Sequence, residues 1–438
     1  MSARGHVLTD WHPEDIAHWD GKLAWRTLAV TTYSMVIAFC VWFLPSTIAP
    51  KLNSIGFELS RGQLYWLAAT PGLSCGIVRF VYMFLPPLVG TRRLVAWSSV
   101  LYVLPMLGWF FAVQSPGTSF SVLLGLAFAC GIGGGSFSGY MPSTGYFFPK
   151  RLQGTALGIQ AGIGNLGMSI IQLIGPLLMG FGLFGITWIA PEQSANGSLW
   201  VHNAAIFFVP WSISAAILAF LVLKDVPVTA NIRQQIDIFA NPDTWFMTLL
   251  YIMTFGMFSG FSASFALLIN NSYGASSPFA GRGAALPNGA AFAFLGPLIG
   301  SLVRVAWGPL CDRFGGAIWT FVSGIGMAVT LGWAALFLNP TDPGQFPGFL
   351  AAMLAMFFFA GIGNAGTFKQ MPMIMPNRQA GGAIGFTAAI ASFGPFLIGV
   401  ALSGIPAAVW FSVCAGYALI CSAICWLRYA RPGAPLPG

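Results

Sequence analysis

Long apolar stretches alternate with short polar connections along almost the whole chain. A helix needs about 20 predominantly apolar residues to cross the roughly 30 Å hydrocarbon core of a bilayer. Twelve stretches are long enough to do so: 27–50, 62–89, 94–114, 118–147, 154–184, 199–223, 244–271, 286–311, 316–338, 347–373, 381–403 and 406–428. The pattern predicts an all-α membrane protein with twelve transmembrane helices, and the even number places both termini on one side.

The composition excludes a soluble fold. Of the 438 residues, 56% are hydrophobic and only 7% are charged, whereas soluble domains carry about 25% charged residues. The net charge of +8 does not indicate a nucleic-acid partner, because the basic residues are scattered over the connections. The basic residues are unevenly distributed between the two sides of the membrane. If the connection after the first span is external, only Lys51, Arg61 and Arg282 of the 19 basic residues lie outside. The positive-inside rule then predicts that both termini are cytoplasmic.

Neither an enzyme nor a metal or cofactor site is expected. The seven cysteines mostly lie within apolar stretches and lack metal-ligand spacing. No nucleophile–base or metal constellation stands out, so there are no candidate catalytic residues. The first 26 residues also lack the pattern of a signal peptide.

The longest polar connection on the predicted cytoplasmic side, 224–243, divides the chain into two halves of six spans each. We predict a cytoplasmic tail at 1–26, an N-terminal six-helix bundle at 27–223, a C-terminal bundle at 244–430 and a second cytoplasmic tail at 431–438. Two such halves with a site at their interface are typical of transporters that work by alternating access.

Internal similarity supports the division. Arg79 precedes Gly90 by eleven residues, and Arg304 precedes Gly315 by the same distance. The stretch ACGIGGGSF, which ends at Phe137, also resembles FAGIGNAGTF in the second half. The repeats predict two pseudo-symmetric bundles.

Arg79 and Arg304 are the main candidates for binding a substrate. Eleven helical residues span about 16 Å, so Arg79 and Arg304 should both lie near the middle of the membrane, where an isolated cation costs several kcal/mol. Two buried cations at equivalent depth indicate an anion between them. A planar guanidinium binds a flat oxyanion through paired hydrogen bonds, which lysine cannot do. The Asn165 amide could also donate to the anion, and Asn364 is the matching candidate in the second half.

No spanning stretch carries a carboxylate or an imidazole at mid-membrane depth. Such groups are the usual proton relay of proton-driven carriers, and arginine cannot replace them because it does not deprotonate in proteins. An empty site would hold two uncompensated cations, which should disfavour closure on both sides. These features favour obligatory exchange of anions.

The sequence resembles the nitrate/nitrite porters, a NarK-like family of the major facilitator superfamily. The resemblance covers almost the whole chain and includes VLTDWHPED, FFPKRLQGTALGIQAGIGNLG, LYIMTFGMFSGFSASFA and FLGPLIGSLVR. The segment GFTAAIASFGPFLIG is similar to the family's second signature but has Pro395 where a glycine is usual. The resemblance implies the major facilitator fold, a bacterial inner-membrane location and a carrier that functions as a monomer in the lipid bilayer.

The resemblance also implies residue roles. It implies that Arg79 and Arg304 bind the anion and that Phe39, Phe137, Tyr251, Phe255, Asn165 and the backbone at Gly164 line the site. Asp312 and Arg313 resemble the superfamily's cytoplasmic loop motif, which stabilises one conformation. Arg92 and Arg93 lie in the corresponding loop of the first half, which lacks the acid.

The function expected from these features is exchange of nitrate for nitrite. The alternative is a proton-coupled nitrate symporter of the same fold, with protonation through Tyr251 or the substrate. A channel would not need two matched halves with deep cations. A sensor would usually carry a signalling domain, which the short tails do not supply.

Overall fold

The computed structural model describes residues 6–8, 11–15, 19–182, 191–194, 197–226, 236–281 and 286–436. Parts of both predicted tails, of the 224–243 connection and of the 154–184 stretch lie outside the described residues, as does Arg282.

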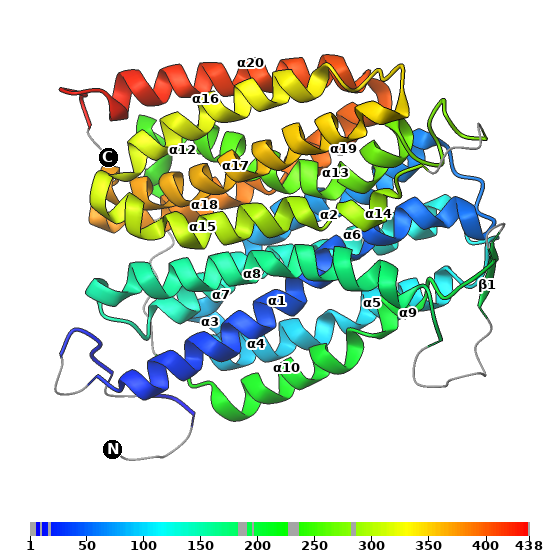
Figure 1. Cartoon of the computed structure of the whole chain (residues 1–438). Coiled ribbons are helices and arrows are strands. Elements are labelled where there is room, and N and C mark those ends of the chain that lie inside the picture. Colours follow the sequence, from blue (N-terminus) through cyan, green and yellow to red (C-terminus); the bar gives the residue numbers. More distant parts are fainter. Residues whose placement is uncertain are drawn as a thin grey trace.

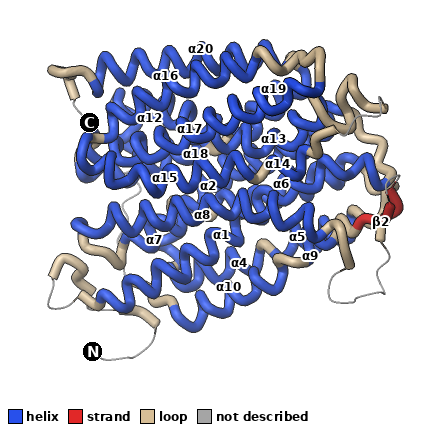
Figure 2. The backbone as a smooth tube through the Cα atoms, viewed as in Figure 1, coloured by secondary structure: helices blue, strands red, loops and turns tan. Residues whose placement is uncertain are grey.

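The described chain is a bundle of long, roughly parallel helices (Figures 1 and 2). The first half contains α1 (Gly21–Leu52), α2 (Arg61–Tyr82), α3 (Leu85–Val89), α4 (Thr91–Leu101), α5 (Val103–Ala112), α6 (Phe120–Gly135), α7 (Phe137–Gly145), α8 (Lys150–Leu178), α9 (Asn203–Ile206) and α10 (Val209–Val222). The short strands β1 (Glu192–Ser194) and β2 (Gly197–Leu199) pair as an antiparallel hairpin at one end of the bundle.

The second half begins with the 3₁₀ turn η3 (Ile236–Ala240). It continues with α12 (Pro242–Tyr251), the π-helical turn η4 (Ile252–Gly256), α13 (Met257–Ser272), α14 (Gly289–Phe292), α15 (Leu295–Phe314), α16 (Gly316–Ala335), α17 (Phe346–Ile374), α18 (Asn377–Ala391), α19 (Gly394–Gly404), α20 (Ala407–Cys425) and the π-helical turn η6 (Trp426–Ala430). Taken singly or as broken pairs, these helices make 12 membrane-length spans among the described residues. The predicted all-α fold with twelve transmembrane helices is confirmed.

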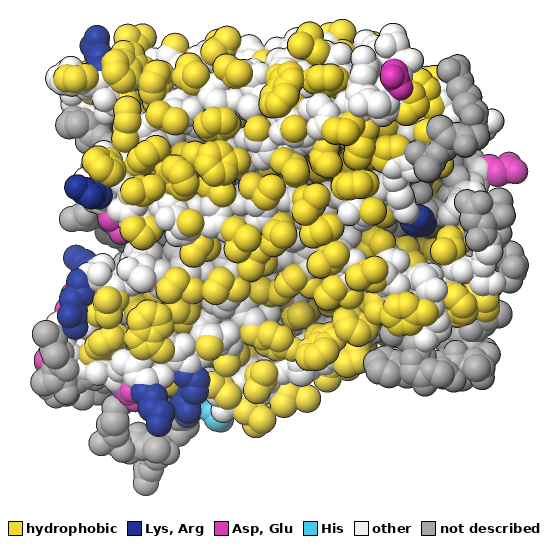
Figure 3. Space-filling view, in the orientation of Figure 1, with side chains coloured by type: hydrophobic (Ala, Val, Ile, Leu, Met, Phe, Trp, Pro, Cys, Tyr) yellow, Lys and Arg dark blue, Asp and Glu magenta, His cyan; other side chains and the backbone are white. Residues whose placement is uncertain are grey.

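The helices extend beyond the apolar stretches that predicted them. Lys150 and Arg151 begin α8, and Asp312 and Arg313 lie in the last turn of α15 rather than in a loop. Hydropathy marks only the part of a helix that contacts hydrocarbon, whereas backbone hydrogen bonding continues into the polar interface. Figure 3 shows the consequence on one face: hydrophobic side chains cover the flank, and most Lys and Arg gather at the end where α1 begins and η6 ends. We call this the basic end.

Two local features recur in the two halves. Gly90 and Gly315, after the second and eighth spans, both have φ 85° and ψ 157°, a conformation for which only glycine is well suited. A contact between threonine hydroxyls also joins the first and fourth spans of each half, although at different positions along the fourth span. These pairs are Thr31 with Thr144 (2.7 Å) and Thr254 with Thr367 (3.0 Å).

Several spans are interrupted near their middles. The eleventh span breaks between α18 and α19, where Pro395 lies near the start of α19. Proline has no N–H to donate and its ring clashes with the preceding turn, so a helix does not continue through it undisturbed. The seventh span contains the π-helical turn η4, directly after Tyr251. Interruptions of this kind are frequent at functional sites, and in a membrane they occur where backbone lines a protein-enclosed cavity.

The halves pack closely at the end opposite the basic end. A Cβ atom on Gly72 of α2 would lie 2.7 Å from the Phe396 backbone nitrogen of α19, so glycine permits this close approach. Three hydrogen bonds also join the halves there: Ser169 Oγ to Phe294 O (2.9 Å), Gln172 Nε2 to Ser262 O (2.8 Å) and Asn271 Nδ2 to Tyr65 OH (3.3 Å).

The contact between α8 and α15 changes along their length. Near the middle, a Cβ atom on Gly162 would lie 2.3 Å from Val305 Cγ2. Nearer the basic end, a Cβ atom on Gly158 or Gly154 would meet no described atom within 4 Å. The helices α8 and α15 therefore diverge toward the basic end, and of these three glycines, spaced four residues apart, Gly162 alone packs tightly against a described atom.

Candidate functional site

The two predicted arginines lie buried near the middle of their helices. The Arg79 side chain has no exposed surface and that of Arg304 is 5% exposed. Arg79 Nε donates to Gly134 O (3.1 Å) and Arg79 Nη1 donates to Ala388 O (2.9 Å). Because Ala388 belongs to α18, Arg79 bridges the two halves. Its Nη2 has no hydrogen-bond partner among the described residues.

Arg304 is less satisfied than Arg79. Both Nη1 and Nη2 of Arg304 are buried without a hydrogen-bond partner in the described chain. The guanidinium lies 5.2 Å from the centroid of the Phe368 ring. No described carboxylate forms a hydrogen bond or ion pair with either arginine, and the two positive charges repel each other. A buried cation without a partner is strongly unfavourable, and the pair has three such guanidinium nitrogens among the described residues, one on Arg79 and two on Arg304.

Aromatic rings connect the two guanidinium groups. Arg79 lies 5.5 Å from the Phe255 ring, and Phe255 stacks on Tyr251 at 5.3 Å with an interplanar angle of 11°. Tyr251 in turn lies 6.4 Å from Phe368, the ring that Arg304 contacts. Tyr251 and Phe255, which are one helical turn apart in the sequence, therefore stack on each other, and the rings form a continuous aromatic chain between the two cations.

The first half supplies a second aromatic pair. Phe137 lies 4.6 Å from the Arg79 guanidinium. Phe39 stacks on Phe137 at 6.3 Å and meets Trp42 edge-to-face at 5.2 Å. Phe137 thus contacts the guanidinium directly, and Phe39 packs against Phe137.

Two further predicted residues carry unpartnered polar atoms. Tyr251 OH and both side-chain atoms of Asn165 are buried without a hydrogen-bond partner within the described ranges. Asn165 lies on the face of α8 that contacts the second half, between Gly162 and Ser169. Gly164 is oriented differently: a Cβ atom there would lie 2.6 Å from Met35 Sδ of α1. The Gly164 position therefore packs within the first half, and the role of its backbone stays a prediction.

Phe368 was not predicted as a site residue, although the sequence contained a signal for it. It ends the repeat FAGIGNAGTF, just as Phe137 ends ACGIGGGSF. Each phenylalanine lies against the arginine of its own half, at 4.6 Å from Arg79 and 5.2 Å from Arg304. Aligned without a gap, Phe137 pairs with Thr367, so the repeat leads to within one residue of Phe368 but does not identify it.

The predicted conformational residues lie at the basic end. Asp312 of α15 forms an ion pair with Lys369 of α17. Arg313 is exposed beside Phe314 at 5.1 Å, and Arg93 is exposed as well. The predicted roles of Asp312, Arg313 and Arg93 in stabilising one conformation stay predictions.

The loop before α4 lacks the acid that Asp312 provides in the second half, but Asp225 from another segment contacts the start of α4. Asp225, just after α10, accepts a hydrogen bond from the Arg92 backbone nitrogen (2.8 Å) at the start of α4. The Arg92 side chain instead donates from Nε to Phe220 O (2.7 Å) and lies 3.8 Å from the Phe220 ring. A carboxylate at a helix N-terminus is stabilised by the helix dipole, so Asp225 fastens α4 to the end of α10.

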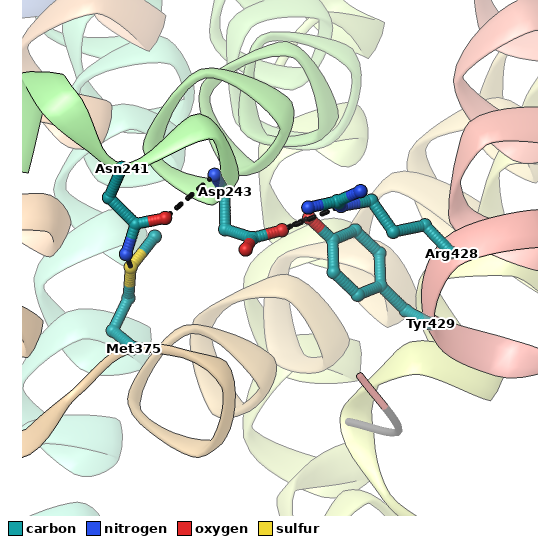
Figure 4. A network of polar contacts seen from close by, with 5 residues as sticks. All are labelled: Asn241, Asp243, Met375, Arg428 and Tyr429. Atoms are coloured by element: carbon teal, nitrogen blue, oxygen red, sulfur yellow. Dashed lines mark hydrogen bonds and ion pairs between the residues drawn. The ribbon is translucent and has the colours of Figure 1, made fainter. Parts of the chain in front are cut away.

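A third polar network fastens the start of the seventh span (Figure 4). Asp243 Oδ1 accepts hydrogen bonds from Arg428 Nε (2.7 Å) and Tyr429 OH (2.6 Å). The neighbouring Asn241 donates to Met375 Sδ at 3.5 Å. The network ties α12, the connection between α17 and α18, and η6 together at the basic end.

Comparison with known proteins agrees with this architecture. Residues 31–306 match the family model described as Major Facilitator Superfamily. The fold is similar to that of a solved bacterial homolog of the human lysosomal transporter Spinster, described as inward-facing and occupied. The TM-score is 0.64 at 14% identity, covering 91% of this chain and 95% of that one.

Sequence relatives narrow the family. A Thermus thermophilus protein named "probable nitrate/nitrite antiporter NarK2" is 51% identical, covering 100% of this chain and 99% of the relative. The nitrate/nitrite transporter NarU of Salmonella typhimurium is 34% identical (97% and 96%), and NarU of Escherichia coli is 33% identical with the same coverage. The chain belongs to the nitrate/nitrite porter family of the major facilitator superfamily, a family of transporters rather than enzymes, and is a multi-pass protein of the bacterial inner membrane.

Proposed function

We propose that this protein exchanges nitrate for nitrite across the inner membrane by alternating access, with the anion bound between Arg79 and Arg304. The names of the relatives support transport of nitrate and nitrite. The observation that carries the proposal is the set of unpaired guanidinium nitrogens, Nη2 of Arg79 and both terminal nitrogens of Arg304, at the interface of the halves.

The site suits a flat, delocalised oxyanion. A guanidinium presents two parallel N–H groups to two oxygens of one anion, and such charge-assisted bonds are roughly twice as strong as neutral ones. The positive edges of aromatic rings also favour a nearby anion, and Phe137, Phe255 and Tyr251 supply rings around the guanidinium groups. Tyr251 OH and the Asn165 amide add unpaired donors from opposite halves.

Exchange follows from the electrostatics of the empty site. When the halves rock to close over the site, water leaves, and two unpaired cations in a low-dielectric environment become more costly. One bound anion compensates much of that cost. The loaded carrier therefore changes conformation more readily than the empty one, and each inward nitrate requires an outward nitrite.

The test is exchange in proteoliposomes. Purified protein is reconstituted in vesicles loaded with nitrite, with chloride or with buffer, and labelled nitrate is offered outside. We expect rapid nitrate uptake only into nitrite-loaded or nitrate-loaded vesicles. Equally fast uptake into vesicles that lack an exchangeable anion would refute obligatory exchange.

Proton-coupled nitrate symport is the alternative mechanism, and an imposed pH gradient separates the two. Symport predicts uptake into buffer-loaded vesicles that rises when the outside is acidic. Exchange predicts uptake that depends on internal nitrite and not on the gradient. The described midplane residues around the arginines include no carboxylate or imidazole, which favours exchange.

A further inference from the structure

We propose that Asn364 of α17 is a further anion ligand and that it distinguishes nitrate from nitrite by binding the oxygen that nitrite lacks. This inference rests on the proposed function. The Asn364 side chain is 1% exposed, and neither Oδ1 nor Nδ2 has a hydrogen-bond partner within the described part of the chain. Buried amides in folded proteins are almost always hydrogen-bonded, so an unpaired amide is significant where it also faces the two arginines.

The neighbours of α17 define the direction of the Asn364 side chain. Gly361 faces α15, because a Cβ atom there would lie 2.6 Å from Gly300 O. Thr367 faces η4, where its hydroxyl contacts that of Thr254. At about 100° per helical residue, Asn364 lies about 60° from each of these two directions and between them. Its amide therefore points into the space between the helix of Arg304 and the segment that carries the Tyr251 and Phe255 rings.

The internal repeat places Asn364 at the level of the second arginine. Aligning CGIGGGSF with AGIGNAGTF pairs Asn364 with Gly134. In the first half, Gly134 O accepts a hydrogen bond from Arg79 Nε (3.1 Å). In the second half, the equivalent position carries a side-chain amide, and both terminal nitrogens of Arg304 are unpaired. An amide can accept from a guanidinium through Oδ1 and donate to an anion through Nδ2 at the same time.

Nitrate and nitrite differ in the number of their oxygens, and this difference makes the Asn364 amide selective for nitrate. Both nitrate and nitrite can present two oxygens to the edge of one guanidinium. Nitrate has a third oxygen in the same plane, which needs a separate donor, whereas nitrite has only a lone pair on nitrogen there. Asn364 Nδ2 supplies that donor. Removing it should weaken nitrate binding and leave nitrite binding nearly unchanged.

The experiment compares Asn364→Leu, which is close in size but cannot hydrogen-bond, with wild type in the exchange assay. We expect the half-saturating nitrate concentration to rise about tenfold and that of nitrite to change less than about twofold, because a hydrogen bond to a charged group is worth about one order of magnitude. Asn364→Ser, which keeps a hydroxyl donor, should recover part of the nitrate affinity.

Gln370→Met is the matched control. Gln370 is on the same helix and is also buried with an unpaired amide, but it faces α16, where its Cβ lies 3.0 Å from the Cβ position of Gly316. Both half-saturating concentrations should stay as in wild type. Unchanged nitrate affinity in Asn364→Leu, or equal losses for both anions, would overturn the inference. Failure of wild type to exchange either anion would instead overturn the proposed function.

Discussion

Replacing Arg304 with glutamine tests the anion site most directly. Arg304 has two terminal nitrogens without partners in the described chain, so a bound anion receives two charge-assisted hydrogen bonds from it. Each such bond contributes about 1.5–3 kcal/mol, and the pair therefore about 3–6 kcal/mol. At about 1.4 kcal/mol per tenfold change, anion affinity should fall by roughly two to four orders of magnitude.

The assay is labelled nitrate uptake into nitrite-loaded proteoliposomes, with the half-saturating concentration measured at equal protein density. Arg26→Gln is the matched control, because Arg26 is an exposed arginine near the start of α1 and far from the interface site. We expect Arg26→Gln to behave as wild type. If Arg304→Gln exchanges nitrate with a half-saturating concentration within about threefold of wild type, the reasoning from unpaired guanidinium nitrogens is wrong.

Three other predictions concern packing, the basic end and pH. Gly72→Ala should greatly reduce exchange because its Cβ would meet backbone at 2.7 Å, whereas Gly125→Ala, at an exposed position of α6 with no described atom within 4 Å, should exchange normally. Asp243→Asn should lower the thermal unfolding midpoint more than Asp312→Asn, because the Asp243 side chain is 9% exposed and that of Asp312 is 62% exposed. Exposed ion pairs contribute only about 0–1 kcal/mol to stability. Equal shifts of the midpoint in the two variants would contradict the prediction. Exchange rates should be nearly constant between about pH 6 and 8, since no histidine or carboxylate contacts the described midplane arginines; a bell-shaped profile would argue for proton coupling.

The spans and the two arginines could be predicted from the sequence because both depend on the transfer of side chains from water into hydrocarbon. A long apolar stretch and a lone cation within it have few alternative explanations. The ends of the spans were less predictable. The residues Lys150, Asp312 and Arg313 continue helices because their backbone can hydrogen-bond equally well in the interface.

Details of the site depend on tertiary contacts that a linear pattern does not contain. The π-helical turn at η4 lies in an ordinary apolar stretch, yet it directly follows Tyr251 and includes Phe255. Asp225 supplies an acid to the start of α4 although it follows α10 in the sequence. Pro395 is visible in the sequence as a departure from the family's second signature, but its consequence, a break next to the helix that supplies Ala388 O to Arg79, requires the fold.

The two arginines are not equivalent, and the asymmetry bears on how the empty carrier behaves. Arg79 donates to one carbonyl from each half, so its charge is partly satisfied and it holds α2 against α18. In the proposed mechanism, rocking of the halves breaks the Ala388 contact, and a bound anion replaces it with a hydrogen bond in which both partners are charged. Arg304 has no such backbone partners in the described chain and depends on the anion for both terminal nitrogens. In the proposed mechanism the anion both releases the bridge at Arg79 and neutralises Arg304, and these two effects together make the loaded state the mobile one.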